Sequence, residues 1–187
     1  MRLDKKEILK PAVTLFVICL VTALLLAVTN MLTHDKIIEI NRQAEAYSRQ
    51  VVLPGATEFE NSEDGTYAIG KTGGAVTGYV FTTKAKSYGG DLSVMTGIGK
   101  DGKVKGVVIL TINDTPGLGL NAQKESFRGQ FYQPAPEKGF TLVKSGAADG
   151  QINAMTGATI TSKAVTECVN QAVSKYQQIK GGEGDGK

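Results

Sequence analysis

An uncharged run near the start of the chain constrains the fold more than any other feature of the sequence. Residues 11–33, PAVTLFVICLVTALLLAVTNMLT, contain no charged side chain. A helix needs about 20 mostly apolar residues to cross the hydrocarbon core of a bilayer. The sequence therefore predicts one transmembrane helix over residues 11–33, after a short leader over residues 1–10.

A cleaved secretory signal and a buried core helix are the alternatives for this run. A signal has a shorter apolar stretch and a cleavage site made of small residues. Here the run is long, and Asn30, Met31 and His34 lie at its end. A core helix of a soluble protein rarely has such uninterrupted apolar length. Retention of the segment as a membrane anchor is therefore favoured.

The basic residues around the run predict its orientation. Those before it are Arg2, Lys5, Lys6 and Lys10, and those soon after it are Lys36, Arg42 and Arg49. Cytoplasmic flanks carry the excess of Lys and Arg. We therefore expect a single-pass protein of the cell membrane, with a cytoplasmic leader and an extracytoplasmic domain after residue 33.

The remaining sequence predicts an α+β domain behind a helical stalk. Residues 34–54 have apolar side chains at helical intervals and end at a Pro-Gly pair. Within the expected domain, residues 55–180, short β-rich segments alternate with glycine-containing turns, which indicates an antiparallel meander. The expected strands cover residues 66–71, 76–87, 91–99, 103–112 and 140–143.

Two helices complete the expected domain. A short helix is predicted over residues 121–131, and a longer one packs on the sheet near the C-terminus. The apolar face of the longer helix consists of Ala164, Val165, Cys168, Val169, Ala172, Val173, Tyr176 and Ile179. Residues 181–187, GGEGDGK, are expected to form a flexible tail.

Charge and composition exclude several kinds of site. The formal net charge is +3, from 21 basic and 18 acidic residues spread along the chain, so nothing singles out nucleic acid as a partner. The single histidine, His34, and the two cysteines, Cys19 and Cys168, have no metal-ligand spacing. We expect no metal site and no catalytic acid, base or nucleophile.

Residues 153–163, NAMTGATITSK, concentrate hydroxyl groups where the last helix begins. The first turn of a helix adds unpaired amides and the positive end of the helix dipole, which together suit an anion. An ordinary N-cap is the alternative, because Thr and Ser are common there. One cap does not account for all of Thr156, Thr159, Thr161 and Ser162.

Residues 117–122, GLGLNA, formally match the G-x-G-x-x-A pattern of dinucleotide-binding proteins. That pattern requires a strand directly before the glycines and a crossover to a second parallel strand. Asp114, Thr115 and Pro116 interrupt the first connection, and Pro134 and Pro136 stand where the second strand would begin. The context argues against a nicotinamide site.

The tetrapeptide Thr156-Gly157-Ala158-Thr159 resembles the flavin-acceptor motif of the FMN-binding domain family. This family includes the G subunit of the Rnf complex and the C subunit of the sodium-pumping NADH:quinone reductase. Tyr88-Gly89-Gly90 and residues 114–119, DTPGLG, resemble two further segments of the family. There, a flavin transferase uses FAD and leaves FMN esterified to the last threonine. The resemblance implies covalent FMN on Thr159.

The resemblance also implies the neighbours of the cofactor. The charge of the phosphodiester is expected near Thr161, Ser162 and Lys163. Ring contacts are expected from Leu118, Gly119 and Tyr88, with a turn residue and a core aromatic as the alternative roles of Leu118 and Tyr88. The other expected cofactor-binding residues are Thr115, Thr156, Gly157, Ala158 and Ile160.

The implied function is an electron relay in an ion-translocating Rnf-type ferredoxin:NAD oxidoreductase. The chain would not be catalytic alone. Its expected partners are the other membrane and peripheral subunits of the complex, with a flavin transferase for maturation. The alternatives are a C-type subunit of the quinone reductase, a stand-alone extracytoplasmic flavin reductase, and an anchored binding module without redox function.

Overall fold

The computed structural model describes residues 5–184, which form two compact units with their boundary between Glu45 and Ala46. The first unit is most of helix α1, Lys5–Val52. The predicted transmembrane helix and stalk are therefore one continuous helix, with Pro11 inside it. Residues 1–4 of the predicted leader lie outside the described residues.

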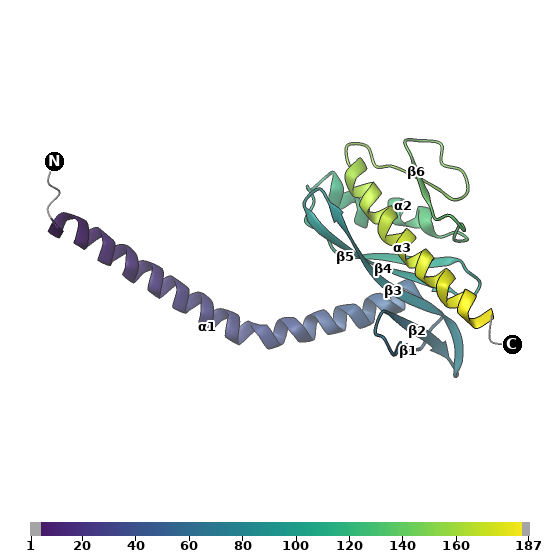
Figure 1. The fold of residues 1–187 in the computed structure, drawn as a ribbon, viewed down its shortest axis with the longest axis horizontal. Coiled ribbons are helices and arrows are strands. Elements are labelled where there is room, and N and C mark those ends of the chain that lie inside the picture. The colour runs from purple at the N-terminus through teal and green to yellow at the C-terminus, as the bar shows by residue number, and fades with distance from the viewer. Residues whose placement is uncertain (1–4, 185–187) are drawn as a thin grey trace. The chain divides into compact units, whose positions relative to one another are not determined.

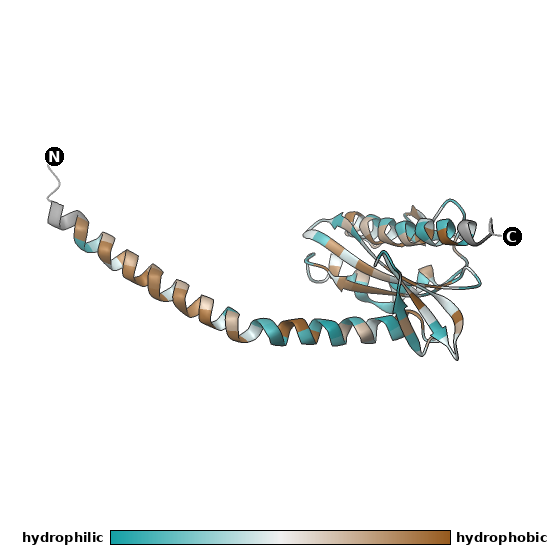
Figure 2. Ribbon diagram, turned by 60° about the horizontal axis from the view of Figure 1, so that its bottom comes forward, coloured by the Kyte–Doolittle hydropathy of each residue, from teal (hydrophilic) through white to brown (hydrophobic). Residues whose placement is uncertain are grey.

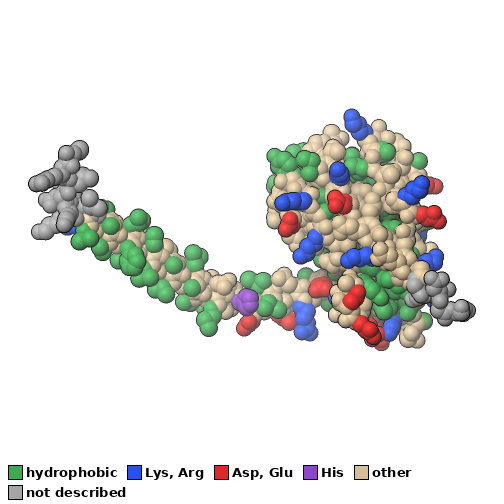
Figure 3. Space-filling view, in the orientation of Figure 1, with side chains coloured by type: hydrophobic (Ala, Val, Ile, Leu, Met, Phe, Trp, Pro, Cys, Tyr) green, Lys and Arg blue, Asp and Glu red, His purple; other side chains and the backbone are tan. Residues whose placement is uncertain are grey.

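Helix α1 is apolar and long enough to cross a bilayer over part of its length. Its most apolar 18-residue window has a mean hydropathy of 2.7, and none of that window is buried. The hydropathy colouring of Figure 2 and the side chains of Figure 3 both show that apolar residues are concentrated in the part of this helix that lies farther from the second unit along the chain. Exposed apolar side chains at such density suit lipid better than water. These features favour a role for α1 as a membrane anchor.

The second unit contains the predicted antiparallel meander (Figure 1). Its strands follow one another in the sheet in chain order, each antiparallel to the next. They are β1 Glu58–Asn61, β2 Tyr67–Thr72, β3 Ala75–Ser87, β4 Gly90–Gly99 and β5 Val104–Thr111. Strand β1 was not predicted, and the other four match the expected segments closely.

Helix α3, Thr159–Gly184, packs across β3 and β4 (Figure 1). Six of the eight residues of the predicted apolar face belong to the main core: Val165, Cys168, Val169, Ala172, Val173 and Tyr176. The Thr83 hydroxyl donates a hydrogen bond to the Cys168 carbonyl at 3.0 Å, which ties the sheet to the helix. The α+β class is confirmed.

The end of α1 packs on the face of the sheet that is opposite to α3. Val52 and Leu53 pack with Ala56, Val80 and other residues in a second, smaller core. A Cβ atom added at Gly97 would lie 2.1 Å from the Val52 carbonyl oxygen. The backbone of the helix end therefore lies directly on the sheet, and only a glycine in β4 leaves room for it.

The connections between β5 and α3 differ from the expected pattern. The segment predicted as one short helix is divided into η1 Gly119–Gln123, α2 Glu125–Arg128 and η2 Gly129–Phe131, because Lys124 has an extended conformation. Strand β6, Thr141–Val143, was expected, whereas its parallel partner β7, Gln151–Asn153, was not. Of the predicted tail, residues 185–187 lie outside the described residues.

Candidate functional site

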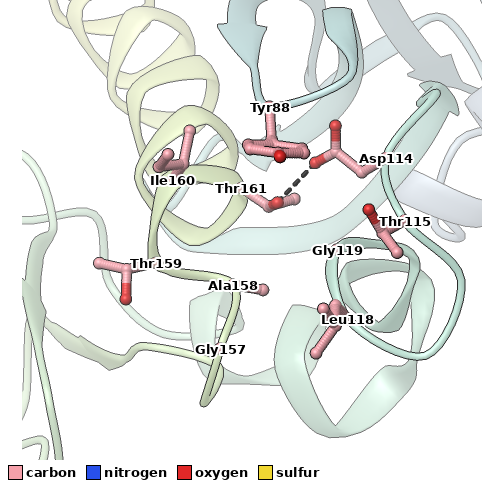
Figure 4. Close-up of a pocket in the computed structure, with 10 residues that line it drawn as sticks. All are labelled: Tyr88, Asp114, Thr115, Leu118, Gly119, Gly157, Ala158, Thr159, Ile160 and Thr161. Carbon is pink, nitrogen blue, oxygen red and sulfur yellow. Dashed lines mark hydrogen bonds between the residues drawn. The ribbon is translucent and has the colours of Figure 1, made fainter.

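Three segments that lie far apart in the sequence surround one cavity in the second unit (Figure 4). They are the turn between β3 and β4, the segment that follows β5, and the first turn of α3. The cavity has a volume of about 460 Å³, within the range of small-molecule sites. Its lining residues are Tyr88, Asp114, Thr115, Leu118, Gly119, Gly157, Ala158, Thr159, Ile160 and Thr161.

The carboxylate of Asp114 joins these three segments. It accepts hydrogen bonds from the Ser87 hydroxyl at 2.5 Å, the Thr161 hydroxyl at 2.5 Å and the Gly89 amide at 2.6 Å. Burial opposes the charge on Asp114, but the three hydrogen bonds outweigh it and hold the pKa of the carboxyl below its usual value. Asp114 is a buried, ionised acceptor that the sequence did not mark as a site residue.

Thr159 differs from the other hydroxyl residues of its segment. It is exposed, it is the first residue of α3 and it lines the cavity. Its hydroxyl makes no hydrogen bond within the part of the chain that the structure describes. Thr156 is also exposed, but it does not line this cavity.

The Thr161 and Ser162 hydroxyls are engaged inside the protein. Thr161 donates to Asp114, whereas Ser162 donates to the Ala158 carbonyl at 2.9 Å and accepts from the Met155 amide at 3.0 Å. Lys163 is exposed and lines a different cavity with residues of β6 and α3. Of the three residues expected around a phosphate, only Thr161 reaches the cavity, and its hydroxyl already has a partner.

Exposed apolar side chains form the rim of the cavity. Tyr88 is 72% exposed, Ile160 56% and Leu118 44%. Tyr88 is therefore not a core aromatic. Leu118 does serve in a turn, because its amide donates to the Thr115 carbonyl at 3.2 Å, and its side chain still borders the cavity. Gly157, at φ +75°, lies so close that an added Cβ would be 3.1 Å from Leu118 Cδ2.

The lining suits a planar aromatic ligand with one tethered anionic end. The rim supplies apolar surface, and the first amides of α3 supply donors that have no acceptor within the helix. Among the residues that the structure describes, no lysine, arginine or histidine lines the cavity. Non-covalent retention of a phosphate would thus depend on backbone amides and threonine hydroxyls, whereas an ester at Thr159 would need no cation. These residues fit FMN held through Thr159.

Comparison with known proteins assigns the family. Residues 87–174 match the FMN-binding domain family, and residues 1–51 match the RnfG N-terminal region. The G subunit of the Na(+)-translocating ferredoxin:NAD(+) oxidoreductase complex of Acetobacterium woodii is 38% identical, over 95% of this chain and 96% of the relative. The chain belongs to the RnfG family.

Further relatives agree with the RnfG assignment. The G subunit of the proton-translocating ferredoxin:NAD(+) oxidoreductase complex of Clostridium ljungdahlii is 35% identical, over 96% of this chain and 97% of the relative. The crystal structure of Shewanella oneidensis NqrC has a TM-score of 0.52 and 18% identity, over 71% of this chain and 73% of that one. The predicted resemblance to RnfG is confirmed, and the likeness to NqrC is one of fold.

Proposed function

We propose that this RnfG-family chain carries FMN covalently on Thr159 and relays electrons within an ion-translocating ferredoxin:NAD oxidoreductase complex. The observation that carries the proposal is the Thr159 hydroxyl. Among the four hydroxyl residues between positions 156 and 162, Thr159 alone both lines the cavity and has a hydroxyl without a partner in the described residues. Family membership and the cavity beside this residue support the same assignment.

Attachment would be a phosphoryl transfer to the Thr159 oxygen. The oxygen forms a bond to the phosphorus of the FMN half of FAD, and the pyrophosphate bond to AMP breaks. AMP leaves, the hydroxyl proton passes to the solvent, and no electron is gained or lost by the flavin. A flavin transferase is the proposed partner in this step, because the Thr159 hydroxyl makes no hydrogen bond to the one carboxylate among the described lining residues. That carboxylate, Asp114, accepts from Ser87, Gly89 and Thr161 instead.

The protein would supply position and shielding to the cofactor. FMN itself accepts and releases electrons. Tyr88, Leu118 and Ile160 would contact the apolar ring, and the amides at the start of α3 would face the phosphodiester. Electrons would pass to and from other membrane and peripheral subunits of the complex. Both relatives are named as subunits of a ferredoxin:NAD(+) oxidoreductase complex, which supports this role.

The same proposal assigns a role to each part of the chain. The basic flank favours an N-terminus in the cytoplasm and a flavin domain on the extracytoplasmic side of the cell membrane. The proposed parts are a leader over residues 1–10, a transmembrane helix over 11–33, a stalk over 34–54, the flavin domain over 55–180 and a tail over 181–187. Alkaline phosphatase fused to the C-terminus should be active, since it requires export.

Intact mass spectrometry tests the attachment. Protein purified from a host that contains the flavin transferase should be heavier than its sequence by one FMN less one water. It should also fluoresce as a flavin in a denaturing gel. Thr159→Val should abolish both signals, and Thr141→Val, at an exposed threonine of β6, should keep them. An unmodified wild-type chain, or FMN mapped to another residue, would refute the proposal.

Electron transfer in membranes tests the relay. In native membranes that carry Thr159→Val, ferredoxin-dependent reduction of NAD should be lost while the other subunits remain assembled on a native gel. If the mutant membranes keep wild-type activity, the flavin on this chain is not in the electron path.

A further inference from the structure

We propose that Asp114 is a positioning residue that fixes the rotation of the first turn of α3 and thereby presents the Thr159 hydroxyl for esterification. This inference rests on the proposed attachment of FMN to Thr159. It concerns a different residue, a different segment and a different step: the placement of the acceptor before any flavin is present.

The geometry of the helix links the two residues. Successive residues of an α-helix are about 100° apart, so side chains at positions 159 and 161 differ by about 200° around the axis. Thr161 is buried and donates to Asp114, whereas Thr159 is exposed. The two project from opposite sides of the first turn (Figure 4). Holding Thr161 inward therefore holds Thr159 outward, where an external enzyme can reach it.

Asp114 is itself held rigidly. It is 5% exposed, and the Gly89 amide and the Ser87 hydroxyl bind its two carboxylate oxygens from the turn between β3 and β4. A Cβ atom added at Gly89 would lie 2.0 Å from the Asn113 carbonyl oxygen, so this turn lies directly against the residue before Asp114. The hydrogen bond to Thr161 thus connects the start of α3 to the sheet.

The remainder of α3 does not depend on this hydrogen bond. The helix packs on the sheet through Val165, Val169 and Val173, which belong to the main core. Its amino end has a second internal link, in which the Ser162 hydroxyl bonds the Ala158 carbonyl and the Met155 amide. Loss of the Asp114–Thr161 bond should therefore loosen the rotation of the first turn and leave the domain folded.

Loosening the turn should slow attachment. In that step the Thr159 oxygen bonds to the phosphorus of the FMN half of FAD while AMP departs, so the oxygen must approach phosphorus in line with the bond that breaks. A displacement of about 1 Å at a reacting atom can cost about 100-fold in rate. An acceptor that samples several rotations reaches that geometry less often.

The experiment is a time course of covalent FMN incorporation into full-length protein by purified flavin transferase with FAD, followed by in-gel fluorescence and intact mass. Thr161→Val and Asp114→Asn should slow incorporation at saturating chain concentration by about tenfold or more. Thr161→Ser keeps the hydroxyl and should restore a rate near that of the wild type. Melting temperature and near-UV circular dichroism, measured on each unmodified chain, report the fold.

Thr166→Val is the matched control. Thr166 is buried in the same helix, and its hydroxyl donates to the Ser162 carbonyl at 2.8 Å instead of to Asp114. The same substitution there should leave the rate within about twofold of the wild type, because it does not touch the link that orients the turn. In the double variant Asp114→Asn with Thr161→Val, the rate should be no slower than in the slower single variant.

Two results would overturn the inference. One is wild-type incorporation in Thr161→Val; the other is equal slowing in Thr161→Val and Thr166→Val, which would indicate a general effect on the helix. Failure of the proposed function gives a different result, because the wild-type chain itself would then remain unmodified. If Asp114→Asn does not fold, the comparison among the Thr161 and Thr166 variants still decides the outcome.

Discussion

Gly119 lies against Asp114 so closely that a Cβ atom added to the glycine would stand 2.4 Å from the Cβ of the aspartate. The same added atom would lie 2.7 Å from the Thr161 hydroxyl oxygen. The backbone of Gly119 does not have a positive φ. Glycine is therefore required at position 119 because Asp114 and Thr161 leave no space for a side chain, and not because of its backbone conformation.

Gly119→Ala should disturb the site and destabilise the domain. The added methyl group has no free space and must push Asp114 or Thr161 away, and overpacking of this kind typically costs about 1–3 kcal/mol. Urea unfolding of the purified protein measures that cost, and FMN incorporation should fall with it. Gly129→Ala is the control, because its nearest contact would be an ordinary 3.6 Å to the Glu125 side chain. A stable, fully flavinylated Gly119→Ala protein would contradict the packing described here.

Thr96→Val should stabilise the protein. The Thr96 hydroxyl is fully buried in β4 and has no hydrogen-bond partner in the described part of the chain. An unsatisfied buried polar group costs about 1–3 kcal/mol, and a methyl group of similar size removes that cost. Thr83→Val is the contrasting variant, since it deletes the bond to the Cys168 carbonyl. Thermal unfolding should show a higher midpoint for the first variant and a lower one for the second.

The sequence predicted the strands and the helix that are long enough to show a clear hydrophobic period. Strands β2 to β5 are separated by turns that contain glycine. The buried residues of α3 recur at helical spacing over several turns. Strands β1 and β7 were missed because EFEN and QIN are too short for a period to emerge. The helix expected over residues 121–131 is interrupted at Lys124, where no proline or glycine marked a break.

The candidate site was predicted in part, for a similar reason. The resemblance to a known family pointed to the three segments that line the cavity, and it predicts Thr159 as the flavin acceptor. It did not identify Asp114 as their junction, because its partners Ser87 and Thr161 are 27 and 47 residues away along the chain. Local sequence also offered Thr161 and Ser162 as ligands of an anion. Only tertiary contacts determine that both hydroxyls are already engaged.

Acid should reduce the stability that Asp114 contributes. Its folded-state pKa lies below the unfolded value of about 3.9, so the charged form stabilises the fold above about pH 4. That contribution is lost as the pH falls through the folded-state pKa. The difference in unfolding free energy between wild type and Asp114→Asn should therefore be largest near neutral pH and shrink below about pH 4.

The pH comparison must separate Asp114 from other carboxylates. Hydrogen bonds from Ser62 and Thr66 lower the pKa of Asp64 to about 2, and the pKa values of Glu60 and Asp101 are lowered beside lysines. All three are retained in Asp114→Asn, so their effects cancel in the difference. A difference that stays constant from neutral pH to pH 3 would mean that folding does not lower the pKa of Asp114.

A chain that starts at Ala46 should fold and remain soluble without detergent. The second unit has two cores of its own. The truncated chain retains Val52 and Leu53, which pack on the sheet. Between Leu9 and Leu32, α1 exposes a dense series of large apolar side chains, all of which the truncation removes. Gel filtration and near-UV circular dichroism in detergent-free buffer measure the result. A second truncation, starting at Ala56, removes Val52 and Leu53 and should unfold or aggregate, because the small core then loses two of its fully buried side chains. Equal behaviour of the two truncations would show that the end of α1 contributes nothing to the domain.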